Sequence, residues 1–257
     1  YRARRAGRLW QQFGRLWQAG ESHGAQAARK ELGLDLGRPV VLLCTNVVGD
    51  SLALNRQVFT AGMAEWLALT VRFFAERPQF QLVVRVHPAE LILAGEPSVE
   101  IVRGALPEMP GHVVVVPPES KVNTYDLVEL AHLGLAYTTT VGMEMSMSGI
   151  PVVVAGRSHY RGKGFTYDPE SLAEYQEMLE TLLVRPRGAR LDSDRVELAI
   201  RYAYRFFFEY PFPFPWHLVQ FWDDIRARPL EAVLSQERRP AYQRTLDALA
   251  GGPIVWN

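Results

Sequence analysis

The sequence predicts an α/β protein, a Rossmann-like parallel sheet with a helical C-terminal extension. Two observations lead to this prediction. Short, almost wholly apolar runs recur between about residues 39 and 155, and such runs are typical of strands buried on both faces of a sheet. The stretches between these runs carry apolar residues at helical spacing. Strands that alternate with helices imply right-handed βαβ crossovers and therefore a parallel sheet.

The expected elements follow in chain order. The first 30 residues carry apolar residues at three- to four-residue spacing and predict a helix. Strands are expected at 39–45, 80–86, 112–116, 133–137 and 150–155. Helices are expected between them at 59–76, 97–105, 125–132 and 143–148. The alternation then stops, and further helices are expected at 170–183, 192–210, 218–228 and 240–250.

Three regions follow from this pattern. Residues 1–32 are expected to form an N-terminal helical linker segment, 33–190 the Rossmann-like domain, and 191–257 a helical extension that packs on that domain. The first helix carries five arginines and no acidic residue in its first fifteen positions. The first interpretation is a solvated helix face on a helix that packs against its neighbour. The alternative is that the arginines contact an anionic membrane surface or a partner protein. The chain starts at Tyr1 without a methionine, so we expect it to be a piece of a longer protein.

Composition excludes several classes of protein. The 28 basic and 28 acidic residues balance, which argues against a nucleic-acid binder. A single cysteine, Cys44, excludes an internal disulfide framework and a cysteine-based zinc site. No apolar run approaches the ~20 residues that span a bilayer.

Polar or glycine-rich residues follow each expected strand. In an open parallel sheet, ligands bind beyond the carboxyl ends of the strands, so these residues are the candidate binding site. The candidates, in strand order, are Asn46; Arg85 and His87; Ser120; Thr138, Thr139, Thr140, Gly142 and Glu144; and Arg157, His159, Arg161 and Lys163.

The strongest single segment is TTTVGMEMSMSGIP, residues 138–151. Hydroxyl residues before a helix start describe a helix N-terminus, which suits a phosphate group. Thr139 or Thr140 would either cap the helix or bind the ligand, and Glu144 is placed to accept a hydrogen bond from a sugar hydroxyl. The alternative is a plain helix cap with a glutamate that complements the helix dipole.

Two further basic segments support an anion site. Arg85 and His87 lie two residues apart, and the period of two in a strand puts both side chains on the same face. The loop 159–168 places Arg161 and Lys163 among glycines, where they either close over an anionic ligand or remain solvated.

The motifs that are absent narrow the chemistry. The sequence holds no GxxxxGK[ST] motif and no GxGxxG after the first strand, which disfavours P-loop hydrolysis and classical NAD binding. It holds no GxSxG nucleophile elbow, which disfavours an α/β-hydrolase. It also lacks HExxH and any acidic cluster with metal-ligand spacing, so no metal site is expected.

Three segments carry a family resemblance. RVHPAE (85–90), TYDLVELAHLGLAYTTTVGMEMSMSGIPVVVAG (124–156) and HYRGKGFTYDP (159–169) are similar to the capsule polysaccharide biosynthesis family. That family includes bacterial Kdo transferases and related glycosyltransferases. The resemblance covers about residues 30–210 and implies the C-terminal, donor-binding half of a GT-B enzyme. It implies that His87 and the threonines 138–140 contact the donor phosphate or nucleotide, and that Glu144 holds a donor hydroxyl.

The resemblance also implies a function. The chain would be the donor-binding part of a metal-independent glycosyltransferase, with 33–190 as its nucleotide-sugar-binding domain, a CMP-linked sugar among the candidate donors, and no other cofactor. Its partners would be the nucleotide sugar, a glycan or glycolipid acceptor and an N-terminal Rossmann domain absent from this chain, which leaves the catalytic residue unassigned. The expected location is the cytoplasm, with peripheral attachment to the inner face of the plasma membrane as a further option. The alternatives are a noncatalytic polysaccharide assembly or export component and a sugar-nucleotide epimerase.

Overall fold

The structure, a computed structural model, describes residues 21–49, 53–92, 95–186, 188–216 and 221–253. The chain divides into two compact units, Tyr1–Ala199 and Ile200–Asn257, and the boundary falls inside helix α9. Most of the helix expected over the first 30 residues lies outside the described residues. Its described end is α3 (Ala25–Glu31).

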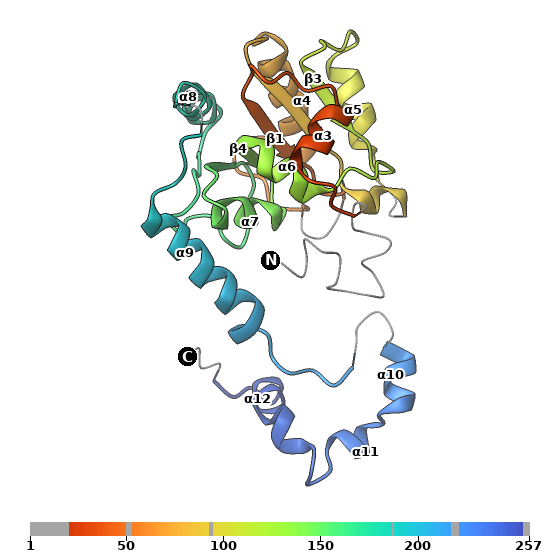
Figure 1. The fold of residues 1–257 in the computed structure, drawn as a ribbon. Coiled ribbons are helices and arrows are strands. Elements are labelled where there is room, and N and C mark those ends of the chain that lie inside the picture. The colour runs from red at the N-terminus through yellow and green to blue at the C-terminus, as the bar shows by residue number, and fades with distance from the viewer. Residues whose placement is uncertain (1–20, 50–52, 93–94, 187, 217–220, 254–257) are drawn as a thin grey trace. The chain divides into compact units, whose positions relative to one another are not determined.

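The first unit is built on a five-stranded parallel sheet in the order β3-β2-β1-β4-β5 (Figure 1). Each expected strand is present within two residues of its expected ends. Their bounds are β1 Val40–Cys44, β2 Gln81–Arg85, β3 Val113–Val116, β4 Ala131–Ala136 and β5 Val152–Val154. The Rossmann-like α/β fold predicted from the sequence is thereby confirmed.

The apolar character of the strands explains why they lie at the centre. Every residue of β1, β2, β4 and β5 is buried, as expected where helices cover both faces of a parallel sheet. The chain proceeds outward from β1 to β2 and β3, then returns to place β4 on the other side of β1. The carboxyl ends of β1 and β4 therefore form the topological switch point, where doubly wound sheets bind ligands.

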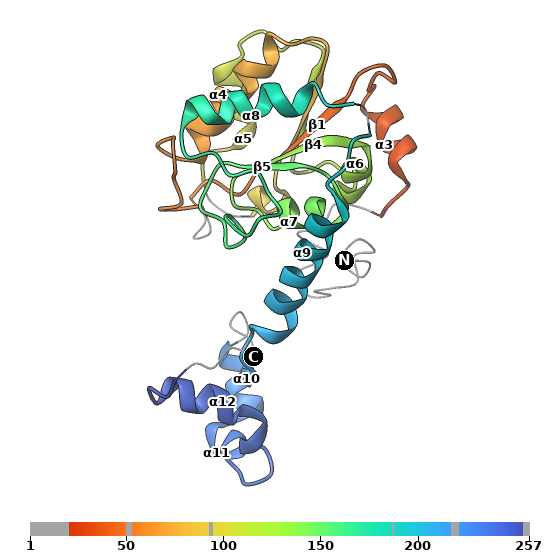
Figure 2. The ribbon, with the colours of Figure 1, turned by 90° about the vertical axis from the view of Figure 1, so that its left-hand side faces the viewer.

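Helices cover the two faces of the sheet in separate groups, as Figure 2 shows. One face packs against α4 (Met63–Ala75), α5 (Ser98–Ala105) and α8 (Leu172–Leu183), and Trp66 and Phe74 of α4 are fully buried there. The other face packs against α6 (Thr124–Leu130) and α7 (Val141–Met147), with α3 against α6. The buried carboxylate of Asp126 accepts hydrogen bonds from Ser22 Oγ (2.5 Å) and from the backbone N–H groups of His23 (3.0 Å) and Gly24 (3.1 Å).

One junction differs from the sequence expectation. The predicted helix 125–132 ends at Leu130, and β4 begins at the next residue, Ala131. Ala131 caps the helix with extended backbone angles, so α6 passes into β4 without a loop. The apolar residues here satisfy helical and strand patterns equally, and no glycine or proline marks the boundary.

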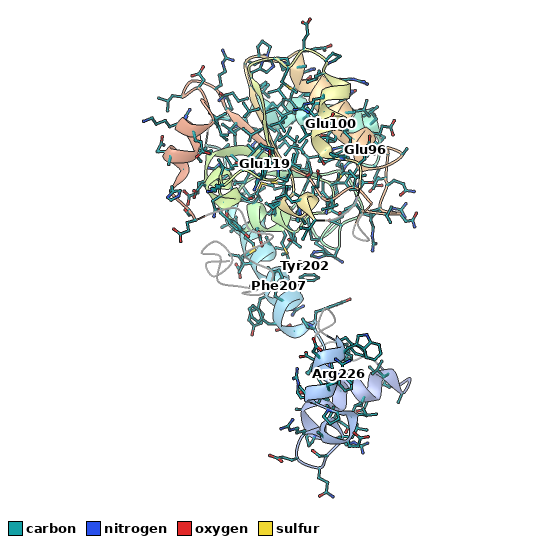
Figure 3. All side chains as sticks on the ribbon, turned by 90° about the vertical axis from the view of Figure 1, so that its right-hand side faces the viewer. Glu96, Glu100, Glu119, Tyr202, Phe207 and Arg226 are labelled. Atoms are coloured by element: carbon teal, nitrogen blue, oxygen red, sulfur yellow. The ribbon has the colours of Figure 1, made fainter. Side chains whose placement is uncertain are left out.

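The second unit contains helices and aromatic contacts. The helix expected at 192–210 is α9 (Ser193–Tyr204) followed by a π-helical turn, η2 (Arg205–Glu209). The helices after it are α10 Phe221–Ala227, α11 Leu230–Val233 and α12 Arg239–Leu249, of which the short α11 was not predicted. The aromatic side chains of 202–210, among them Tyr202 and Phe207 (Figure 3), contact one another: the Tyr204 and Phe208 rings lie 5.4 Å apart. That the extension packs on the sheet domain stays a prediction.

Candidate functional site

The switch point joins two of the predicted site segments directly. Asn46, immediately beyond β1, accepts a hydrogen bond at Oδ1 from the backbone N–H of Thr138, beyond β4, at 3.1 Å. Both residues are buried, and 92 positions separate them in the sequence. The Asn46 amide thereby fixes the start of the threonine segment against the end of β1.

His87 lies beside this junction at the end of β2. Its backbone N–H donates to Thr45 Oγ1 at 3.0 Å, which holds the β1 and β2 ends together. Its ring Nδ1 accepts a hydrogen bond from Ala89 N at 3.1 Å and so caps the short 3₁₀ helix Pro88–Leu91. With Nδ1 as an acceptor, the neutral ring carries its proton on Nε2, which makes Nε2 a donor.

Glu90, in the same motif, has a local structural role. Its carboxylate accepts hydrogen bonds from the backbone N–H (3.0 Å) and hydroxyl (2.5 Å) of Ser98, at the start of α5. Burial raises the pKa of Glu90 above its usual range. Part of the RVHPAE motif therefore serves to position α5.

Arg85 lies beneath the edge rather than on it. The residue is 2% exposed, and its guanidinium donates to the Pro117 carbonyl (2.8 Å) and to Thr124 Oγ1 (3.3 Å). The third nitrogen, Nη2, is buried and has no hydrogen-bond partner in the described residues. Burial lowers the pKa of Arg85, and the neighbouring Cys44 and Glu119 oppose that shift. Glu119 lies on the connection after β3 and is labelled in Figure 3. The geometry makes Arg85 a buried cation that ties β2 to the connection between β3 and α6.

The threonine segment leads into α7, a helix of seven residues. Thr138 and Thr139 are buried and Thr140, the residue before the helix, is half-buried. Thr140 makes no side-chain capping bond, so its hydroxyl does not serve as the plain helix cap that was the alternative. The Thr139 carbonyl accepts hydrogen bonds from Gly142 N (3.1 Å) and from Tyr160 Oη (2.7 Å).

Tyr160 leaves no space for a side chain at Gly142. A Cβ atom at Gly142 would lie 2.2 Å from Tyr160 Oη and 3.0 Å from the Ala136 Cβ. The Tyr160 ring is fully buried and burial raises the pKa of its hydroxyl. A glycine is therefore needed for α7 to approach both β4 and the loop after β5.

Glu144 is also buried, at 2% exposure, and it accepts a hydrogen bond from Tyr125 Oη at 2.9 Å. Its carboxylate thus lies inside the domain, between α7 and α6, and its role toward a donor hydroxyl stays a prediction. Arg85 and Glu144 both bond to residues of α6, Thr124 and Tyr125, so the buried cation and the buried carboxylate lie on the same face of the sheet.

Cys44 supplies a chemical test of this buried region. Burial raises the pKa of its thiol to about 12, Arg85 opposes that shift and Glu144 adds to it. Because the thiolate is the nucleophile, we expect iodoacetamide at pH 8 to leave Cys44 unmodified in the folded chain and to alkylate it after unfolding in urea. Mass spectrometry of the intact chain measures this. Rapid alkylation of the folded chain at pH 8 would contradict the burial of Cys44.

The loop after β5 separates the predicted basic residues. The Arg161 guanidinium donates to the carbonyls of Val154 and Pro169 and pairs with Glu170 at 3.0 Å, so it holds its own loop in place. Arg157, His159 and Lys163 are exposed, and Ser120, beyond β3, is half-buried. The loop is closed further by Asp168, whose carboxylate accepts from Gly162 N and Thr166 Oγ1, each at 2.8 Å.

The structure thus sorts nine of the thirteen predicted site residues into three groups, which leave out Ser120, Arg157, His159 and Lys163. Those at the switch point are Asn46, His87, Thr138, Thr139, Thr140 and Gly142. Arg85 and Glu144 lie beneath it, and Arg161 is bonded within its own loop. Tyr125 and Tyr160 also support the site, but the sequence analysis did not select them. A buried tyrosine leaves no pattern of spacing in the sequence. The one available signal was that both residues fall within the motif segments.

Neither a metal centre nor a membrane span appears among the described residues. They hold no group of three or more His, Cys, Asp or Glu side chains that could bind a metal ion. No helix in the described part of the chain combines the length and apolar character that crossing a bilayer requires.

A model of the family described as "Capsule polysaccharide biosynthesis protein" matches residues 3–185. The chain belongs to this capsule polysaccharide biosynthesis family. The match runs through all five strands and the three motif segments, so it confirms the resemblance carried by those motifs. No curated protein matches the chain.

Several solved structures are similar to this capsule-family chain. The beta Kdo 2,4 transferase KpsC of Thermosulfurimonas dismutans has 17% identity and a TM-score of 0.43, over 71% of this chain and 47% of that one. A UDP-GlcNAc 2-epimerase of Neisseria meningitidis, bound to UDP-GlcNAc, has 14% identity and a TM-score of 0.45, over 68% and 42%. The wall teichoic acid polymerase TagF has 10% identity and a TM-score of 0.43, over 70% and 42%. The chain spans about half the length of these structures, and likeness at this level carries no argument about its substrate.

Proposed function

We propose that the chain is the donor-binding part of a glycosyltransferase in bacterial capsule or surface polysaccharide synthesis. The donor would be a nucleotide sugar, with no bound metal or further cofactor, and the acceptor a glycan or glycolipid. The observation that carries the proposal is the hydrogen bond between Asn46 and Thr138, because it brings the threonine segment to the switch point of the sheet. Membership of the capsule family supplies the class of product.

The donor phosphate would lie beyond the ends of β1 and β4. The hydroxyls of Thr139 and Thr140 would donate hydrogen bonds to that phosphate, and Nε2–H of His87 would approach it from the end of β2. When the bond between sugar and phosphate breaks, negative charge grows on the departing phosphate. Donors already oriented toward that charge lower the barrier without reorganising. Arg85 would add a positive potential from beneath the edge.

The remaining partners belong to the same proposal. An N-terminal Rossmann-like domain would bind the acceptor and supply the catalytic base or acid. The complete enzyme would work in the cytoplasm, including at the inner face of the plasma membrane, where a glycolipid acceptor would be accessible.

Calorimetric titration of the chain with CMP, UDP and GDP tests the donor site. We expect one of these nucleotides to bind, and Thr139→Ala to weaken its affinity about ten- to a hundredfold, since a hydrogen bond to a charged group contributes ~1.5–3 kcal/mol. His87→Ala should weaken it by a similar factor. Thr181→Ala, at an exposed position of α8, and His23→Ala, at an exposed position before α3, are the matched controls.

Two results would count against the proposal. If none of the three nucleotides binds, the edge is no donor site. If the Thr139 and His87 variants bind as the unmodified chain does, the nucleotide binds elsewhere. Product analysis with a sugar nucleotide then separates transfer from epimerisation.

A further inference from the structure

A second polar site lies at the opposite edge of the sheet, where β1 and β4 begin. Val40 and Ala131, the first residues of these strands, line a cavity of about 100 Å³ together with α3 and the segment after α8. Its charged and titratable lining residues are Arg29, Arg38, Arg190 and His132, and no acidic side chain lines it. In a chain whose formal net charge is zero, this is a local excess of positive charge.

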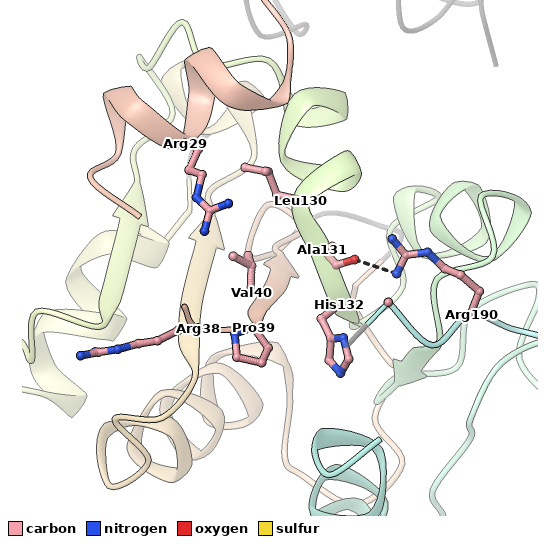
Figure 4. A pocket seen from close by; sticks show the side chains of 9 residues that line it. Arg29, Arg38, Pro39, Val40, Leu130, Ala131, His132 and Arg190 are labelled. Atoms are coloured by element: carbon pink, nitrogen blue, oxygen red, sulfur yellow. Dashed lines mark hydrogen bonds between the residues drawn. The ribbon is translucent and has the colours of Figure 1, made fainter. Parts of the chain in front are cut away.

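The two arginines that flank the cavity are held in place by backbone carbonyls. Arg29 Nε donates to the Leu34 carbonyl at 3.2 Å, and its Nη2 donates to the Asp35 carbonyl. Arg190 Nη1 donates to the Ala131 carbonyl at 3.3 Å, drawn as the dashed line in Figure 4. A guanidinium has five N–H donors, so these bonds orient each group without using all of its donors.

Figure 4 shows Arg29 and Arg190 on either side of the Leu130–Ala131–His132 segment, while the Arg38 side chain extends away from them. Arg38 pairs with Asp35 at 3.2 Å, and both side chains are about half exposed, so solvent screens that pair. His132 is buried at 6% exposure and adds a ring to the wall of the cavity. Positive charge thus reaches the cavity from at least two directions.

We propose that this cavity binds a phosphate group. A phosphate carries more acceptor oxygens than a carboxylate, and their tetrahedral arrangement accepts hydrogen bonds from several directions at once. Arg29 on α3 and Arg190 after α8 line the same cavity, so each would contribute hydrogen-bond donors to the bound group. The bound phosphate would link α3 and the segment after α8 to the amino ends of β1 and β4. This site lies at the other edge of the sheet from the proposed donor site and does not depend on it.

Titration with inorganic phosphate tests the site, with sodium chloride at equal ionic strength as the salt control. We expect phosphate, but not chloride, to raise the unfolding temperature of the chain and to give a saturable binding isotherm. Arg29→Gln and Arg190→Gln should each weaken phosphate binding about tenfold or more, because each removes a charge-assisted contact. Arg103→Gln, at an exposed position of α5, is the matched control and should bind as the unmodified chain does.

Hydrogen exchange locates the binding independently of the variants. Phosphate should slow exchange in 25–31 and 131–133, whether or not it also binds at the proposed donor site at 138–142. Glycerol phosphate in place of inorganic phosphate shows whether a phosphomonoester also fits, which separates a free ion from a phosphorylated molecule. Arg29→Lys keeps the charge and serves if Arg29→Gln does not fold. The proposal is overturned if phosphate gives no more stabilisation than chloride, if folded Arg29 and Arg190 variants bind phosphate unchanged, or if the protection appears at 138–142 instead.

Discussion

Replacing Gly142 by alanine is expected to lower the free energy of unfolding by about 3 kcal/mol. The new Cβ would meet Tyr160 Oη at 2.2 Å and the Ala136 Cβ at 3.0 Å, and both neighbours are fully buried. Tyr160 is fully buried, and its hydroxyl is bonded to the Thr139 carbonyl at 2.7 Å. The alanine therefore either displaces α7 or breaks that bond. Urea denaturation followed by circular dichroism measures the loss.

A double substitution identifies the cause. Tyr160→Phe alone should cost about 1 kcal/mol, the usual net contribution of one hydrogen bond. Because it removes the atom that clashes, Gly142→Ala combined with Tyr160→Phe should cost less than the sum of the two single changes. Gly104→Ala, in α5 where a Cβ would meet nothing within 4 Å, is the control and should leave stability equal or higher. Strict additivity of the two changes would show that Gly142 and Tyr160 do not constrain each other.

Arg85→Ala is expected to lower the free energy of unfolding by about 4 kcal/mol. It would leave a void under the carboxyl edge and remove the donors that bond the Pro117 carbonyl and Thr124 Oγ1. Arg85→Met keeps most of the volume and removes the cost of burying a charge, so we expect its loss to be about half as large. The difference between the two variants separates packing from charge, and urea denaturation measures both.

The methionine variant also tests the role of Arg85 beneath the donor site. If the guanidinium contributes positive potential there, the folded Arg85→Met protein should bind the nucleotide about tenfold more weakly in calorimetry. Arg103→Met, at an exposed arginine of α5, should change neither stability nor nucleotide affinity. Unchanged affinity in the folded Arg85→Met protein would limit Arg85 to a structural role.

Much of the sheet domain could be predicted because its signals are local. The runs VVLLC, QLVVR and VVVV are apolar enough to need cover on both faces, and the helices between them have the spacing to provide it. The passage from α6 to β4 was misplaced because the residues 129–132 fit either element equally well. The 3₁₀ helix Pro88–Leu91 and the helix α11 were missed for a related reason, since elements of four residues carry too few positions to show a period.

The candidate site also has a part that could be predicted from the sequence and a part that could not. The approach of the Asn46 and Thr138 segments follows from strand order, since right-handed parallel crossovers bring all carboxyl ends to one edge. The burial of Arg85 and Glu144 does not follow from strand order. Alternation in β2 placed Arg85 and His87 on one face, but it carried no information on how deeply a guanidinium lies or what it bonds.

The sequence by itself determined the class of fold, the edge at which the polar loops gather and the family, because each of these depends on patterns within short stretches of chain. The tertiary structure decided which polar side chains remain near that edge. The Tyr125 hydroxyl donates a hydrogen bond to Glu144, and the Tyr160 hydroxyl donates one to the Thr139 carbonyl. Arg161 donates to carbonyls of its own loop. Such pairings depend on how the side chains of several elements pack together. The spacing of apolar residues within a single helix or strand therefore does not predict them.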